Sequence, residues 1–437
     1  MNWEQLLSLK RQGDTLKRLR LEQDETRIGF EVDYDRIIFS SSFRSLQDKT
    51  QVIPFSKTSF VHTRLTHSLE VSVVGRSLGR VVGKKLIEKY PYLQQTYGFL
   101  SNDFGAIVAA ASLAHDIGNP PFGHSGEIGD FFKNGEGVGF KESLSEQQYE
   151  DLCNFEGNAN GFKIISENKA GIKGGLRLSY ATLGAFTKYP RKSILDKKSD
   201  HIKDKKFGFF HSQNTFFDEV ANELGMVDSN GEYMRHPLAY LVEAADDICY
   251  TLIDFEDGIN LGWISEEYAL EFLIRLVKDS IDTKKYNSLK HKTDRVAYLR
   301  ALSVNTLIND TVKIFLKNEE KILNGEFTKT LLSESVFKAQ MEDIIDISVK
   351  KVYNSKEVIE KELKGYQVIH KLLSVFIKAA VNNQSDNTTA LDDLVLASLP
   401  KTYIHKEGDL YNQLLDISCF VASLTDGNAL EWYNKIS

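Results

Sequence analysis

The chain has 437 residues, of which 42% are hydrophobic and 26% are charged, a balance typical of a globular protein with a substantial core. Only seven prolines occur in this length, which favours long uninterrupted helices over a loop-rich or all-β design. The net charge of −7 argues against a surface that coats nucleic acid generally, although it is compatible with a local basic patch.

The N-terminal segment and the cysteines predict a cytoplasmic protein with no membrane partner. Charged residues appear within the first ten positions and no apolar stretch follows, so no signal peptide is expected. The longest apolar run, 104–114, is too short to span a bilayer and is typical of a buried helix. The three cysteines, Cys153, Cys249 and Cys419, form no CxxC pair and suggest no disulfide framework.

Helical periodicity dominates the first part of the chain. Residues 1–30 are charged and are predicted to include a short helix. Apolar residues then recur at three- and four-residue steps over 62–90, which predicts a long helix. A second helix is expected over 103–116, with the preceding Ser-Asn pair as capping candidates.

The remaining segments continue the helical pattern. The stretch 133–175 is rich in glycine and asparagine and is predicted to be the most irregular part. Basic residues outnumber acidic ones over 188–206, for which we predict a solvated loop. A helix is expected over 237–255, and apolar residues at helical spacing over 264–437 indicate several amphipathic helices. With no internal repeat and no convincing hairpin, the sequence predicts an all-α fold.

Four polar side chains stand where inward-facing apolar residues are expected. His67 precedes a run of valines and leucines at helical steps, and His115 and Asp116 close a very apolar helix. Asp246 lies within another apolar helix. Buried charges are costly unless they are paired or bound to metal, and imidazole with carboxylate is a common ligand set for divalent cations. Spacing alone leaves open both a shared metal site and separately satisfied core residues.

Longer motifs carry a resemblance to a known family. Five segments stand in the family's order: HTRLTHSLEV, LAHDIGNPPFGHSGE, FEGNANGFKII, YATLGAFTKYP and RHPLAYLVEAADDICY. They resemble the motif set of bacterial deoxyguanosinetriphosphate triphosphohydrolases, which belong to the HD-domain superfamily. FRSLQDKTQV fits the same family upstream, so matching segments span roughly 27–258, and FVASLTDGNAL is similar to a short family element near the end.

The resemblance implies the organisation of the chain. We expect 1–437 to form a single large helical body with an HD-domain catalytic core over 60–258. The helical C-terminal region over 259–437 is then expected to form the interface of a closed homo-oligomer, because family members often assemble as hexamers.

The resemblance also implies a cofactor. His67, His115, Asp116 and Asp246 are expected to bind one divalent ion per subunit, either Mn²⁺ or Mg²⁺. Two imidazoles and two carboxylates leave coordination positions open for water and for an α-phosphate oxygen. An ion in such a site polarises phosphorus and lowers the pKa of bound water.

An acid–base pair is expected beside the metal. His124 and Glu127 stand about one helical turn apart and would share a face of a helix. A histidine oriented by a carboxylate is a standard proton-transfer pair. The resemblance assigns this pair either to activating the attacking water or to protonating the leaving 5′-oxygen, and the sequence leaves both roles open.

Phosphates need cations, and the resemblance points to Arg64 and Lys188. Arg64 lies three residues before His67, on nearly the same helical face. Lys188, in the TKYP segment, offers a point charge that suits a mobile phosphate chain. Either residue, taken alone, is more typical of a protein surface.

The sugar is expected to be recognised along one helix. Asp246, Tyr250 and Asp254 are spaced by four residues and form a stripe along it. The resemblance implies that Tyr250 stacks under the deoxyribose and leaves no room for a 2′-hydroxyl. Asp254 would accept a hydrogen bond from the 3′-hydroxyl, with Gln51 as a second polar contact. Asn158 is expected to face the pocket, with no partner that the sequence identifies.

The predicted reaction is hydrolysis of a deoxynucleoside triphosphate (dNTP) at the α-phosphorus, which yields a deoxynucleoside and inorganic tripolyphosphate. The family name points to dGTP, but no residue is a recognisable reader of guanine. The chain also lacks the GxxxxGK[ST] loop of P-loop enzymes.

Two other interpretations remain. An HD phosphodiesterase would share the metal ligands but has no need for the pair Tyr250 and Asp254. A nucleic-acid-binding or nucleotide-sensing protein with a vestigial site is suggested by the basic segments 17–20 and 188–206. Single-stranded DNA or a second dNTP would then be a partner or an effector, and DNA binding would depend strongly on salt.

Overall fold

The computed structural model describes residues 1–16, 18–23, 27–52, 62–123, 126–168, 171, 173–194 and 201–436. Over these residues strand pairing is limited to three isolated bridges, which confirms the predicted all-α fold. None of the helices in the described ranges is long and apolar enough to cross a membrane.

The α-helices fall into an N-terminal and a C-terminal set. Up to residue 223 they are α1 (Trp3–Leu6), α2 (Gly29–Ile38), α3 (Ser41–Arg44), α4 (Arg64–Lys89), α5 (Tyr92–Gln95), α6 (Ser101–Ala114), α7 (Gly126–Lys133), α8 (Glu146–Cys153), α9 (Gly157–Ser166), α10 (Tyr180–Phe186) and α11 (Asn214–Glu223). Beyond it they are α12 (Pro237–Asn260), α13 (Glu266–Val277), α14 (Thr283–Ser288), α15 (Lys292–Lys317), α16 (Glu319–Leu323), α17 (Lys338–Ser348), α18 (Lys356–Gln384), α19 (Ala390–Ser398), α20 (Leu410–Ser423) and α21 (Asp426–Ile436).

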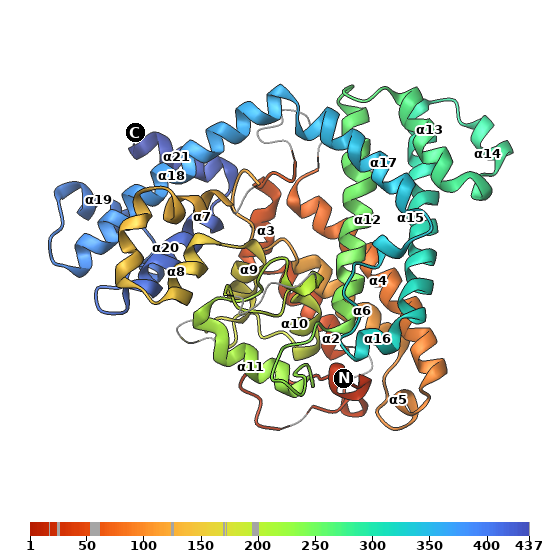
Figure 1. Cartoon of the computed structure of the whole chain (residues 1–437), viewed down its shortest axis with the longest axis horizontal. Coiled ribbons are helices and arrows are strands. Elements are labelled where there is room, and N and C mark those ends of the chain that lie inside the picture. The colour runs from red at the N-terminus through yellow and green to blue at the C-terminus, as the bar shows by residue number, and fades with distance from the viewer. Residues whose placement is uncertain are drawn as a thin grey trace.

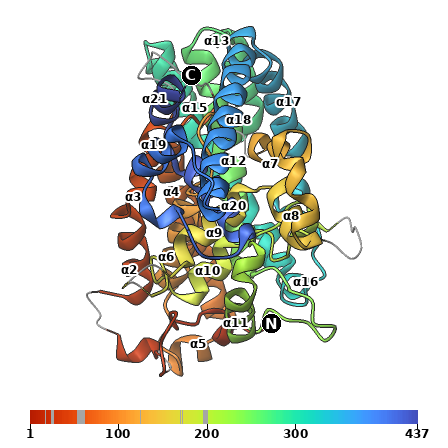
Figure 2. The same ribbon diagram turned by 90° about the vertical axis from the view of Figure 1, so that its left-hand side faces the viewer.

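Two hydrophobic clusters form the core. The first lies where α4, α6, α12 and α15 pack together, and it includes Leu78, Ile107 and Leu241. The second joins α7 and α8 to α18 and α20, and it includes Leu152 and Leu372. Figure 1 shows α12 near the middle of the molecule, and Figure 2 shows α18 to α21 gathered on the face turned to the viewer. Helices from both halves of the sequence therefore build both clusters.

A glycine face brings α4 and α6 into close contact. Gly75, Gly79 and Gly83 are spaced by four residues on α4, so they line one side of the helix. A Cβ atom on Gly79 would lie only 2.6 Å from the carbonyl oxygen of Phe104 in α6. Glycine at these positions lets the two backbones approach, and this approach fixes where the two helix ends that carry His67 and His115 stand.

The turn after α6 packs against the start of α9. A Cβ atom on Gly118 would lie 2.1 Å from the carbonyl oxygen of Gly157 and from the amide nitrogen of Gly161. The side-chain amide of Asn160 donates a hydrogen bond to the carbonyl oxygen of Gly118 at 2.7 Å. The FEGNANG motif therefore supports the turn that follows His115.

Several predicted boundaries differ from the structure. The segment 133–175, predicted to be irregular, contains α8 and α9. The helix predicted over 237–255 continues through Gly258, because this glycine serves close packing against Ile264 and Val352 rather than termination. At the start of α6 the Ser-Asn pair lies inside the helix, and the Asp103 carboxylate caps it by accepting from the Leu100 amide.

Candidate metal centre

Four side chains meet at one point, and we call them the metal centre. His67 comes from the first turn of α4, His115 and Asp116 directly follow α6, and Asp246 comes from the middle of α12. Donor atoms of His67, His115 and Asp116 all lie within 4.8 Å of one another. Oδ1 of Asp246 lies 3.1 Å from Nε2 of His67 and 3.4 Å from Nε2 of His115. The structure thus brings together the four residues predicted as ligands.

The chemistry of this donor set fits a divalent ion. Nδ1 of His115 lies 2.7 Å from the carbonyl oxygen of Ser112, which can only accept, so the proton belongs on Nδ1. Nε2 of His115 is buried, has no hydrogen-bond partner in the described structure, and faces the carboxylates of Asp116 and Asp246. A histidine that binds metal through one ring nitrogen usually donates a hydrogen bond from the N–H of the other, often to a backbone carbonyl oxygen. The resemblance of the motifs implies a divalent metal, and this cluster fits one.

Both carboxylates of the centre remain ionised. Burial raises the pKa of Asp116, but His115 and Arg64 outweigh it and hold the pKa at about 2. Burial also opposes ionisation of Asp246, and Lys188 and His115 bring its pKa well below the usual range. Ionised oxygens are the form that binds a cation.

The two cations predicted to bind phosphate are paired with metal-centre carboxylates. Nη1 of Arg64 donates to Oδ2 of Asp116 at 2.8 Å, and Nη2 donates to the carbonyl oxygen of Gly123 at 3.2 Å. Nζ of Lys188 donates to Oδ2 of Asp246 at 2.6 Å. Both positive groups are therefore buried directly beside the centre, and their contact with a triphosphate stays a prediction.

The predicted sugar residues lie together on α12, and a third residue joins them. The ring of Tyr250 stacks on Tyr353 with centroids 5.8 Å apart and planes 6° apart. The Tyr353 hydroxyl donates a short hydrogen bond to Oδ2 of Asp254. Oδ1 of Asp254 is buried and has no partner within the described ranges, so it is available to a hydroxyl donor.

Tyr353 was missed by the sequence reasoning. It belongs to a short π-helical turn, Val349–Tyr353, between α17 and α18. Such turns often occur at functional sites, but they leave no mark in hydrophobic periodicity. The partner Asp254 lies 99 residues away in the chain, so no local pattern connects the two residues.

Two further predicted substrate residues have partly defined surroundings. Gln51 is half-buried, and its amide oxygen has no hydrogen-bond partner in the part of the chain that the structure describes. The side-chain amide of Asn158 donates to Glu156 at 2.9 Å. Glu156 in turn pairs with Lys206 at 3.0 Å, so Asn158 is tied to a surface ion pair.

Of the predicted acid–base pair, Glu127 can be described and His124 lies outside the described residues. Glu127 is buried at the start of α7, and its Oε2 atom has no hydrogen-bond partner among the residues that the structure describes. Burial raises the pKa of Glu127 to about 8, and the carboxylate of Glu362 on α18 adds to this shift. Protonation of Glu127 near neutral pH is a property expected of a proton-transfer group.

This shift predicts how stability depends on pH. Glu127 binds its proton more tightly in the folded chain than its ordinary pKa of 4.5 would give. Its protonation therefore adds to the free energy of unfolding at low pH, and this contribution is lost as pH rises from about 4.5 to 8. We expect the Glu127→Gln variant to lack this pH dependence of stability. The melting temperature of the variant, relative to that of the wild type, should therefore rise toward pH 8. Thermal unfolding of both proteins across this range measures the difference. Parallel curves would contradict the raised pKa.

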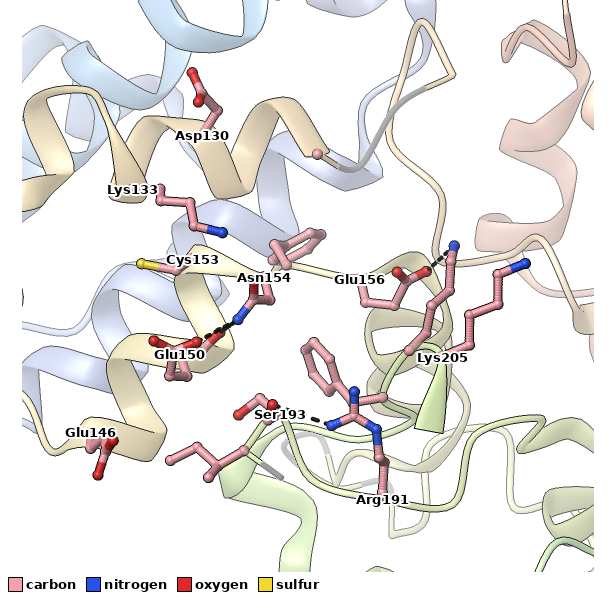
Figure 3. Close-up of a pocket in the computed structure, with 15 residues that line it drawn as sticks. Asp130, Lys133, Glu146, Glu150, Cys153, Asn154, Glu156, Arg191, Ser193 and Lys205 are labelled. Carbon is pink, nitrogen blue, oxygen red and sulfur yellow. Dashed lines mark hydrogen bonds and ion pairs between the residues drawn. The ribbon is translucent and has the colours of Figure 1, made fainter. Parts of the chain in front are cut away.

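A separate cavity of about 680 Å³ is lined by α7, α8 and residues from the stretches 191–194 and 205–207 (Figure 3). Charges of both signs line it: Lys133, Arg191, Lys205 and Lys206, with Asp130, Glu146, Glu150 and Glu156. None of the four metal-centre residues lines this cavity.

Part of the basic segment 188–206 lines the cavity, and several of its described charges are neutralised. Lys188, Lys203 and Lys206 each form an ion pair with a carboxylate, which reduces the positive charge that this segment offers to a nucleic acid.

Comparison with known proteins places the chain in a family. Residues 64–173 match the family model described as HD domain. The chain is 37% identical to a deoxyguanosinetriphosphate triphosphohydrolase-like protein of Synechocystis sp. (strain ATCC 27184 / PCC 6803 / Kazusa), over 100% of this chain and 99% of the relative. A similarly named protein of Pseudomonas aeruginosa (strain LESB58) is also 37% identical over the same shares.

The similarity extends to relatives with the shorter name. A deoxyguanosinetriphosphate triphosphohydrolase of Enterobacter sp. (strain 638) is 32% identical over 79% of this chain and 76% of its own length. Identity of 37% over the whole chain to the first two relatives, together with the HD match, confirms the resemblance of the motifs. The chain is a hydrolase of the HD-domain superfamily and belongs to the deoxyguanosinetriphosphate triphosphohydrolase-like family.

Proposed function

We propose that this enzyme hydrolyses dNTPs at the α-phosphorus and releases a deoxynucleoside and inorganic tripolyphosphate. The observation that carries the proposal lies on α12. Asp246 of the metal centre stands two helical turns before Asp254, whose Oδ1 has no hydrogen-bond partner among the described residues and suits a sugar hydroxyl. One helix thus presents a group for the reacting phosphate and a group for the deoxyribose. A general phosphodiesterase has no need for the second group.

The proposed cofactor is one divalent ion per subunit, Mn²⁺ or Mg²⁺, held by His67, His115, Asp116 and Asp246. When bound, it supplies a Lewis acid for the phosphorus and a water of lowered pKa. The carbonyl oxygen of Ser112 keeps His115 in the tautomer that presents Nε2 to the site.

The remaining roles belong to side chains around the centre. Arg64 and Lys188 neutralise charge on the phosphates, since both are buried cations beside the metal ligands. Glu127 and His124 move the proton, with the buried Glu127 carboxyl orienting the imidazole. Tyr250 places its ring against the sugar.

We also propose that the enzyme is a homo-oligomer that uses its C-terminal helices as the interface. Large apolar side chains are exposed on α18 and α19, and they include Ile359, Leu363, Leu391 and Leu394. Exposed apolar groups of this kind are typical of protein–protein contacts. Binding of single-stranded DNA, which the basic segments 17–20 and 188–206 suggest, and regulation by a second dNTP both stay hypotheses.

The test is a product analysis. Metal-supplemented protein is incubated with each of the four dNTPs and with the matching ribonucleotides, and products are separated by anion-exchange chromatography. We expect deoxynucleoside and tripolyphosphate from dNTPs and little product from ribonucleotides, and the same data rank the four bases. Absence of tripolyphosphate with every dNTP, alone and in pairs, would overturn the proposal, and diester substrates would then be tested.

A further inference from the structure

The corner between α20 and α21 contacts two loops that lie far from it in sequence. We call residues 422–427 the C-terminal corner, and Asp426 is its central side chain. Only 5% of Asp426 is exposed. Its Oδ2 atom accepts hydrogen bonds from the backbone amide and the hydroxyl of Thr50, and its Oδ1 atom accepts from the Phe122 amide at 2.9 Å. One carboxylate therefore joins the loop before α4 to the loop after α6.

A second link runs through a buried lysine. Nζ of Lys49 donates to the carbonyl oxygen of Ala422 in the corner at 2.7 Å, and to the carbonyl oxygen of Asn119 at 2.7 Å. Lys49 is almost fully buried, so an ammonium without these partners would be costly. The corner thus contacts the loop after α6 at two points, Asn119 and Phe122.

Both contact points lead to the metal-centre residue Asp116. The side-chain amide of Asn119 donates to Oδ1 of Asp116 at 2.6 Å. Arg64 donates to Oδ2 of Asp116 and also to the carbonyl oxygen of Gly123, which follows Phe122 directly. Each oxygen of Asp116 is therefore oriented by a donor whose own position depends on the loop held by the corner.

The backbone at Phe122 needs such support. Its φ angle of 65° lies in the left-handed region, where a bulky residue is a genuine outlier. The buried ring packs against α18, and a Cβ atom on Gly365 would lie 2.7 Å from the Phe122 Cβ atom. Surrounding structure must hold a residue in such a conformation, and the bond to Asp426 contributes directly to it.

We propose that Asp426 is a positioning residue of the metal centre, and that the C-terminal corner sets the orientation of the Asp116 carboxylate through Phe122, Gly123 and Arg64. The inference rests on the proposed role of Asp116 as a metal ligand. The SLTDGNA motif, which contains Asp426, would thus help to position the Asp116 carboxylate, although the two lie some 300 residues apart in the sequence. Partners that orient metal ligands commonly change metal affinity by about 10- to 100-fold when they are altered.

The experiment compares Asp426→Asn with Asp392→Ala in the full-length protein. The amide of the first variant keeps the size of the side chain but cannot accept from both loops. Asp392 is a matched control, because it is buried to a similar degree, 4% exposed, and its carboxylate accepts from Thr389 and Asn382 near α19. After metal is stripped with chelator, Mn²⁺ is titrated, and free Mn²⁺ is followed by electron paramagnetic resonance.

We expect Mn²⁺ to bind Asp426→Asn about tenfold more weakly than the wild type, and to bind Asp392→Ala with wild-type affinity. Wild-type affinity in Asp426→Asn, or equal weakening in both variants, would overturn the inference. Asp116→Ala is titrated alongside. If Asp116→Ala binds Mn²⁺ normally, then the proposed metal centre is itself wrong. If Asp116→Ala binds weakly but Asp426→Asn binds normally, then the metal centre stands and only the role of Asp426 is wrong.

A milder variant covers the case in which Asp426→Asn does not fold. Thr50→Val removes only the hydroxyl donor to Asp426 and keeps the backbone bond and the shape of the side chain. We expect Mn²⁺ affinity to fall about twofold with little change in melting temperature. Unchanged affinity in a folded Thr50→Val protein would count against the proposed route.

Discussion

An Asp246→Ala variant is expected to lose dNTP hydrolysis by about a thousandfold or more. The substitution removes a carboxylate whose Oδ1 atom lies within 3.4 Å of Nε2 of both His67 and His115. It also leaves the buried ammonium of Lys188 without its partner. Loss of a metal ligand forfeits several kcal/mol of transition-state stabilisation, and each factor of ten in rate corresponds to about 1.4 kcal/mol. Release of tripolyphosphate at saturating Mn²⁺ measures the loss.

The neighbouring aspartate is the natural comparison. Asp247 follows Asp246 on α12, and its side chain forms neither a hydrogen bond nor an ion pair with His67 or His115 in the described structure. We expect Asp247→Ala to keep most of the wild-type rate of tripolyphosphate release. Equal losses of this rate in both variants would mean that damage to α12, and not loss of a ligand, explains the effect.

An Asp254→Asn variant is expected to lose recognition of the 3′-hydroxyl. Oδ2 of Asp254 is held by Tyr353, and Oδ1, for which the described part of the chain supplies no partner, is the proposed acceptor. Leaving one partner of a buried hydrogen bond unsatisfied costs about 1–3 kcal/mol, so kcat/KM for dGTP should fall about 10- to 100-fold. The analogue that lacks the 3′-hydroxyl, 2′,3′-dideoxyguanosine triphosphate, should be turned over almost equally by both proteins. Steady-state kinetics with the two nucleotides give the ratio.

Tyr353→Phe is the companion variant, because it removes only the hydroxyl that orients Asp254 and keeps the ring stacked on Tyr250. We expect its preference for dGTP over the dideoxy analogue to fall in the same direction, by a smaller factor. If Asp254→Asn slows both nucleotides equally, then Asp254 supports the helix and does not recognise the sugar.

The sequence predicted the long helices, and it singled out the residues that come together at the metal centre, for related reasons. Apolar periodicity over 62–90 predicts α4 to within two residues at its start and one at its end. A polar side chain on the inward face of such a helix is exceptional, which is why His67 stands out from its apolar neighbours in the sequence alone. The ordered motifs then supplied roles that spacing alone left open.

What the sequence could not predict depends on contacts between distant segments. Tyr353 reaches α12 from 99 residues away, and Asp426 reaches Thr50 from 376 residues away. Neither contact leaves a periodic trace, because each uses one side chain at the end of a helix. Gly258 illustrates the same limit, since local rules suggest a helix end where tertiary packing against Val352 requires a small residue.

The long reach of Asp426 bears on when the enzyme first becomes active. A ribosome makes the chain from its N-terminus, and all four metal-centre residues are made before Tyr353 and Asp426. A nascent chain that ends after α12 would carry every ligand, yet it would lack the hydroxyl on Asp254 and the carboxylate that holds Phe122. On the roles proposed for these two residues, a chain that has not passed the C-terminal corner would bind metal more weakly and recognise the sugar less well than the finished protein.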